Sequence, residues 1–289
     1  MYYALILISV IMFGGNFALS DVYRKMRGSG LKISLESSLI GSLAGLAVLV
    51  IINGFQFELT PFTLVMALLS ALNSLGFTFC SFRALEHINL SLFSLFSMLG
   101  GMVLPFLQGI LFYKEDITVA KVVCFLFIFA ALLMTVTRGD DKKKGMIYYA
   151  GIFILNGMSG VITKIYTSAP FPKADAAGYS SWIALCTAAL SALLLPILFR
   201  GSSKSDPPFT RKAVGICALH GIVGKVANFV LVIALAHVDA SVQYPMVTGG
   251  TMIVSSLICL FGDRKPSKKE IFSVILAFIG TLALFVIPI

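Results

Sequence analysis

Ten apolar stretches, each long enough to cross a lipid bilayer, follow one another from residue 2 to residue 289. A helix needs roughly 20 apolar residues to span the hydrocarbon core. Lipid leaves unpaired backbone groups unsatisfied, so such segments must be helices rather than open strands. We therefore predict an all-α membrane protein with ten transmembrane helices. The expected spans are 2–23, 33–53, 62–85, 89–112, 119–137, 146–167, 176–199, 213–236, 240–262 and 270–289.

The composition excludes a water-soluble globular protein. Hydrophobic residues make up 58% of the 289 residues and charged residues 12%. A soluble fold of this length leaves much of its surface in water, and it could not bury so much apolar area. The connections between the stretches are also too short to hold a separate soluble domain.

The basic residues indicate the orientation of the chain. Sixteen of the 22 Lys and Arg residues fall in the four connections that share one side of a ten-span chain. The opposite side holds Lys114, Lys121 and Lys173. Cytoplasmic connections carry such an excess, so we expect a protein of the cell membrane with both termini outside. Nucleic acid is not an expected partner, because a nucleic-acid site gathers its basic residues on one folded surface.

The second half of the chain repeats the first. Residues 84–91 match residues 234–241, and a glycine pair follows each: Gly100-Gly101 and Gly249-Gly250. The offset of about 150 residues is close to five spans. An odd number of spans per repeat inverts the second copy, and transporters with inverted repeats bind solute between the halves near the midplane. We predict two inverted five-helix repeats around a central cavity, residues 1–138 and 146–289, joined by a basic loop at 139–145.

This organisation resembles the drug/metabolite transporter superfamily, in particular its EamA-type branch. The resemblance covers the whole chain and rests on residues 244–250 (YPMVTGG), 263–267 (DRKPS) and 112–118 (FYKEDIT). It implies a cavity lined by spans 1, 3, 4, 6, 8 and 9. It also implies the transport of amino acids, sugar phosphates, choline or other small metabolites.

Polar residues inside the spans point to the same six segments. They recur at spacings of three, four and seven, which places them on one face of a helix. Spans 119–137 and 270–289 are nearly free of polar side chains, so they face lipid or a second subunit, in a monomer or a homodimer. The candidate solute-binding residues are Lys225, Asn16, Asn73, Asn156, Asn228, Tyr244, Gln243 and Thr248.

Several of these positions have a structural alternative. Ser, Thr and Gly stripes are common at tight helix-packing faces. For each Asn, two interpretations stand beside each other: an interhelical hydrogen bond and contact with the solute. The candidate hinge residues could instead mark close helix crossings. The three histidines are interpreted as turn, cap or interfacial residues, namely His87, His237 and His220. The hinge candidates are Gly100, Gly101, Pro245, Gly249 and Gly250.

Lys225 stands apart because it lies near the centre of span 213–236. A charge there costs at least about 2.5–3.5 kcal/mol, and an ionisable residue inside the membrane indicates function by default. The structural alternative is a salt bridge or a neutral, hydrogen-bonded lysine. No acidic residue lies near the centre of any span, which favours an anionic or zwitterionic solute over a cation.

We expect a secondary active or facilitative transporter of a small organic metabolite that works by alternating access. An exporter of amphipathic drugs or aromatic compounds is the alternative. An intramembrane enzyme is disfavoured because no catalytic constellation lies at the midplane. A phosphate-binding loop for ATP is absent from the sequence, so ATP does not drive transport directly. Proton coupling stays open, and the sequence does not identify the coupling ion. The five cysteines show no Cys-x-x-Cys pairing, and no metal or cofactor is expected.

Overall fold

The computed structural model describes residues 2–88, 90–114, 117–135, 146–199, 209–235, 237–238, 240–261 and 265–287. Over these ranges the chain forms ten α-helices and no strand. The basic loop at 139–145 lies outside the described residues. The helices are α1 (Tyr2–Arg27), α2 (Leu31–Ile52), α3 (Pro61–His87), α4 (Leu90–Tyr113), α5 (Val119–Thr135), α6 (Met146–Ser168), α7 (Ala176–Phe199), α8 (Arg211–Leu235), α9 (Ala240–Leu260) and α10 (Lys268–Val286).

The all-α class is confirmed, and the ten helices coincide in position with the ten predicted spans. In the described part of the chain, six helices are long and apolar enough to cross a membrane: α1, α2, α3, α7, α8 and residues 96–113 of α4. Residues 119–131 of α5 and 271–280 of α10 form shorter apolar helices. The chain is therefore compatible with a multi-pass membrane protein.

Local sequence explains where several helices begin and end. The side chain of Thr60 accepts a hydrogen bond from the Thr63 backbone at 3.1 Å, and Pro61 takes the first position of α3. Helix α1 continues past the predicted residue 23 and ends in a basic turn, which suits the negative end of the helix dipole. Gly28 then stops α1 with a φ of +101°, a conformation that glycine adopts at little cost.

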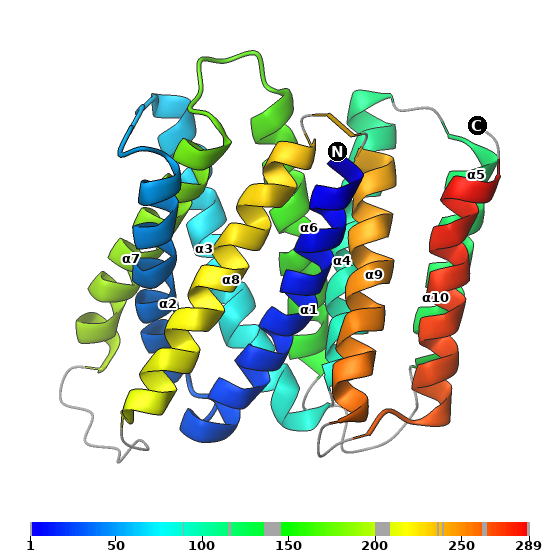
Figure 1. The fold of residues 1–289 in the computed structure, drawn as a ribbon, viewed down its shortest axis with the longest axis horizontal. Coiled ribbons are helices and arrows are strands. Elements are labelled where there is room, and N and C mark those ends of the chain that lie inside the picture. The colour runs from blue at the N-terminus through cyan, green and yellow to red at the C-terminus, as the bar shows by residue number, and fades with distance from the viewer. Residues whose placement is uncertain are drawn as a thin grey trace.

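The helices pack side by side in a single bundle (Figure 1). Helix α1 packs against α8 and α9, and α6 packs against α3 and α4. Helix α2 contacts α7 and α8, while α4 contacts α9. Helices α5 and α10 pair with each other at one edge of the bundle, and the N- and C-terminal ends lie at the same end of it (Figure 1).

Glycines bring several helices into close contact. Gly100 of α4 leaves no room for a Cβ against the backbone of Phe153 in α6, and Gly41 of α2 meets Gly221 of α8 in the same way. A Cβ at Gly250 of α9 would lie 2.7 Å from Val10 of α1. Helices α4 and α9 run without a break through their glycine pairs and through Pro245. The close-crossing interpretation therefore has direct support, and a hinge role for Gly100, Gly101, Pro245, Gly249 and Gly250 stays a prediction.

A central cavity as the candidate functional site

A cavity of about 260 Å³ lies within the bundle. Eight helices form its wall, α1 to α4 and α6 to α9, whereas the described side chains of α5 and α10 contribute none of it. Phe17 of α1 and Phe93 of α4 close part of the wall, with their rings edge to face at 5.0 Å between centroids. Most of the other wall residues that carry polar groups are Ser, Thr and Asn. The cavity is thus a chamber in which hydroxyl and amide groups are interspersed with apolar side chains.

The structure brings all eight candidate solute-binding residues to this wall. They come from five helices, α1, α3, α6, α8 and α9, which are far apart in the sequence. Their contact with a solute stays a prediction. The eight residues are Asn16, Asn73, Asn156, Lys225, Asn228, Gln243, Tyr244 and Thr248.

Among the described residues of the wall, Lys225 is the one Lys or Arg, and no Asp or Glu accompanies it. It lies near the middle of α8, and its aliphatic stem packs against Gly45 of α2. Among the described residues, none makes a hydrogen bond or ion pair with its ammonium. The salt-bridge alternative therefore finds no partner in the described part of the chain.

The four asparagines divide into two pairs. Asn73 of α3 donates a hydrogen bond to the carbonyl oxygen of Leu155 at 2.8 Å, and Asn156 of α6 donates to that of Ser97 at 2.7 Å. These two side chains therefore tie neighbouring helices together. The side chains of Asn16 and Asn228 make no hydrogen bond to another described residue. The hydrogen-bond interpretation therefore applies to Asn73 and Asn156, and solute contact by Asn16 and Asn228 stays a prediction.

The polar residues of α9 hold that helix to three others. Gln243 donates to the Leu231 carbonyl of α8 at 3.0 Å. Tyr244 donates to the Gly160 carbonyl of α6 at 3.1 Å, and Thr248 donates to the Met98 carbonyl of α4 at 3.2 Å. Every one of these residues also lines the cavity. Helix α9 is thereby hydrogen-bonded to α4 in the first half of the chain and to α6 and α8 in the second half.

Helices α2 and α7 also line the cavity, which the sequence analysis missed. Ser37, Ser38 and Ser42 of α2 belong to the wall, as does Thr187 of α7. The signal was present in α2, because its serines and Gly41 recur at spacings of three and four. Such a stripe is the same pattern that marked the other helices.

His220 also lines the cavity, although the sequence analysis did not count it among the solute-binding candidates. Its ring Nδ1 lies 3.2 Å from the backbone oxygen of Asn16. Helices α1 and α8 cross closely here, because Gly224 of α8 faces the amide of Asn16. This side of α8 therefore faces the chamber, and the interfacial interpretation of His220 stays a prediction.

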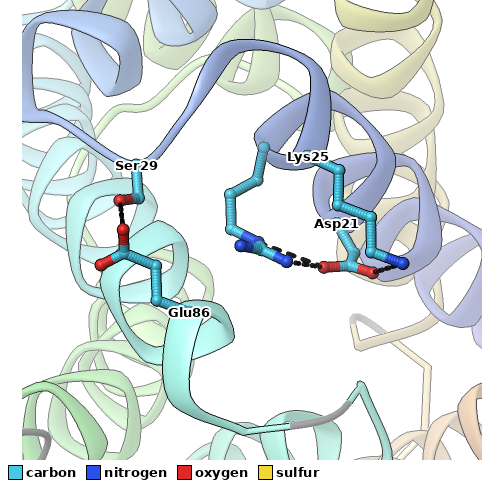
Figure 2. Close-up of polar contacts among 5 residues, drawn as sticks. Asp21, Lys25, Ser29 and Glu86 are labelled. Atoms are coloured by element: carbon cyan, nitrogen blue, oxygen red, sulfur yellow. Dashed lines mark hydrogen bonds and ion pairs between the residues drawn. The ribbon is translucent and has the colours of Figure 1, made fainter. Parts of the chain in front are cut away.

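A layer of polar contacts lies beside the cavity, where α1 and α3 end (Figure 2). Asp21 pairs with Arg24 at 2.8 Å and with Lys25 at 3.2 Å. Ser29, just past α1, donates a hydrogen bond to the carboxylate of Glu86 at the end of α3. The layer follows directly on the wall residues Ser20 and Ser81, so it bounds the chamber at the end of the bundle that carries the α1–α2 connection.

A third ion pair supports the same connection. Arg27 and Glu36 meet at 2.7 Å, and the Arg27 side chain is only 3% exposed. The guanidinium also lies 3.9 Å above the ring of Phe209. No group of three or more His, Cys, Asp or Glu that could hold a metal ion occurs in the described ranges.

Comparison with known proteins establishes the fold alone. No family model matches the chain, and no curated protein matches it. A crystal structure described only as that of a protein aligns with 96% of this chain and 94% of its own, with a TM-score of 0.66 and 21% sequence identity. The helical arrangement is therefore shared along nearly the whole length of both chains.

Proposed function

We propose that this protein transports a small organic anion or zwitterion, such as an amino acid or a phosphorylated metabolite, across the cell membrane. The observation that carries the proposal is the charge of the chamber, where Lys225 faces no carboxylate. A buried charge is costly unless it is paired. A solute carboxylate or phosphate would supply that partner through a charge-assisted hydrogen bond. The resemblance to the EamA-type transporters agrees with this function.

The helix packing supports two inverted repeats, residues 1–138 and 146–289. Each helix has a counterpart in the other half, five numbers away. Replacing every helix by its counterpart turns the pairs α1–α8 and α1–α9 into α6–α3 and α6–α4, and both sets of contacts occur. The pairs α2–α7, α4–α9 and α5–α10 each join a helix to its own counterpart. Solute sites between such repeats are accessible alternately from each side. We infer that this chain works by alternating access, as a facilitative or secondary active transporter.

Ten crossings with both termini outside are the orientation that we propose. The two terminal ends lie at the same end of the bundle, as an even number of crossings requires (Figure 1). The sixteen basic residues of four connections would then face the cytoplasm, and three would face outside. Helices α5 and α10 would contact lipid, or each other's copies in a homodimer.

Uptake by purified protein in proteoliposomes tests the function. The probes are labelled L-serine, L-glutamate, L-lactate and glucose 6-phosphate, with choline as the cation. We expect uptake of at least one anion or zwitterion by the wild type, and its loss in Lys225→Met, which keeps much of the stem volume. Lys212→Met serves as the matched control, because Lys212 is exposed at the start of the same helix. Uptake of choline alone, or unchanged anion uptake by Lys225→Met, would contradict the proposal.

A further inference from the structure

We propose that His220 is the proton-binding group of the chamber, and that a proton on its Nε2 crosses the membrane together with the solute anion. This inference rests on the proposed transport function. It assigns the proton coupling to one atom, and it explains why an imidazole lies on the same wall as an unpaired ammonium.

The hydrogen bond of the ring decides which nitrogen takes the proton. Nδ1 lies 3.2 Å from the Asn16 carbonyl oxygen, and a carbonyl oxygen can only accept. The neutral ring therefore carries its hydrogen on Nδ1, which leaves Nε2 as an acceptor. Nε2 has no hydrogen-bond partner among the described residues. A proton can thus add at Nε2 without breaking the contact between α8 and α1.

Among the described residues, the chamber wall around His220 carries one cationic side chain. Lys225 lies on the same helix, and its charge acts on the ring. The wall residues of α1, α2, α6 and α7 carry no titratable group, and α9 contributes Tyr244. Toward the end of the bundle that carries the α1–α2 connection, other titratable groups are packed together. Arg27 and Glu36 are paired to each other there. Those groups on α1, α2 and α8 are Tyr23, Arg27, Glu36 and Cys217.

Proton and anion therefore favour each other's binding. In the empty chamber, a protonated His220 and Lys225 repel each other. An anion bound in the chamber attracts both, and by linkage the proton raises the affinity for the anion by the same factor. A monoanion and its proton then leave as a neutral pair, while Lys225 stays behind. A proton gradient can thus drive accumulation of the solute.

Proteoliposomes that enclose a pH-sensitive dye test this coupling with the same four anionic and zwitterionic probes. We expect that anion uptake by the wild type acidifies the lumen, and that a pH gradient concentrates a monoanion about tenfold for each pH unit. His220→Gln should still equilibrate the anion through Lys225, without acidification and without accumulation. His237→Gln is the matched control, because His237 is exposed beyond the end of α8, and it should behave like the wild type.

The outcomes separate this inference from the transport function. Anion uptake by the wild type without acidification, or acidification that persists in His220→Gln, overturns the role of His220 and leaves transport intact. If the wild type takes up none of the probes, the transport proposal fails and the inference fails with it. Nitrogen NMR of ¹⁵N-histidine-labelled protein in nanodiscs adds a readout that needs no solute. A neutral His220 ring with its proton on Nε2 would overturn the inference by itself.

Discussion

Gly45 of α2 lies directly against the stem of Lys225 in α8. A Cβ atom at position 45 would lie 2.7 Å from Lys225 Cγ and 3.0 Å from its Cβ, with the Gly221 carbonyl oxygen at 3.1 Å. These atoms belong to the inner part of the side chain and to the backbone, so they cannot swing aside easily. The absence of a side chain at position 45 therefore lets the stem of Lys225 pack directly against the backbone of α2.

Gly45→Ala should impair solute binding without removing any charge. Overpacking at such a contact costs about 1–3 kcal/mol, which corresponds to a loss of affinity of about five- to 150-fold where the cost falls on the bound state. Concentration-dependent uptake and thermal unfolding would measure both effects. Gly15→Ala on α1 is the control, because a Cβ there meets nothing within 4 Å. Equal behaviour of the two variants would contradict the positioning role.

Lys225→Arg should restore transport only in part. The guanidinium is planar and broader than an ammonium, and Gly45 already touches the stem of this residue. We expect measurable uptake with weakened affinity, between the wild type and Lys225→Met. Full activity of Lys225→Arg would mean that the chamber requires only a positive charge and no defined position for it.

The two asparagine pairs should respond differently to truncation. Asn156→Ala removes the hydrogen bond to Ser97, so it should lower the free energy of unfolding by about 1 kcal/mol. Asn228→Ala removes no hydrogen bond to a described residue, so it should reduce solute affinity at nearly unchanged stability. Thermal unfolding and uptake together distinguish the pairs. A destabilised Asn228→Ala that transports normally would assign this residue to helix packing.

Glu36→Gln should destabilise the protein strongly. The substitution leaves the guanidinium of Arg27 buried without its counter-charge, and such a loss costs about 3–5 kcal/mol. Glu58→Gln changes an exposed carboxylate, and it should have little effect. Unfolding in detergent with increasing denaturant compares the two variants. Equal stability would show that solvent or another group compensates for the Arg27 charge.

Cysteine labelling in intact cells tests the orientation. A membrane-impermeant maleimide should react with Gln56→Cys in the α2–α3 connection, which we place outside. It should reach Ser202→Cys, in a basic connection, only after the cells are opened. The four native cysteines Cys124, Cys186, Cys217 and Cys259 are buried and Cys80 is partly so, and a version lacking all five serves as background. The reverse pattern would invert the topology.

The helices could be predicted from sequence because apolar length is a local property. Span 33–53 corresponds to α2 and span 62–85 to α3, and their bounds differ from the predicted ones by one or two residues. The largest difference occurs at α1, where three basic residues extend the helix to Arg27. Their charges ended the predicted span, although they stabilise the last turn of a helix.

The site was predicted less completely, because a stripe on one helix does not say which neighbour it faces. His220 and the serines of α2 line the chamber as a result of the contact between Gly41 and Gly221, which sets how α2 and α8 lie together. Likewise, the bonds of Asn73 and Asn156 end on backbone oxygens, which every residue carries. No pattern in the sequence marks such acceptors.

Helices α5 and α10 stand outside the chamber wall, and their outward residues are large and apolar, from Leu126 and Phe129 to Phe272 and Ile275. A bilayer requires only that such a surface be apolar and of the right length. Recognition of the solute therefore places little constraint on the sequences of α5 and α10. In a saturation library, these two segments should accept almost any exchange among Leu, Ile, Val and Phe, while substitutions around Lys225 are lost.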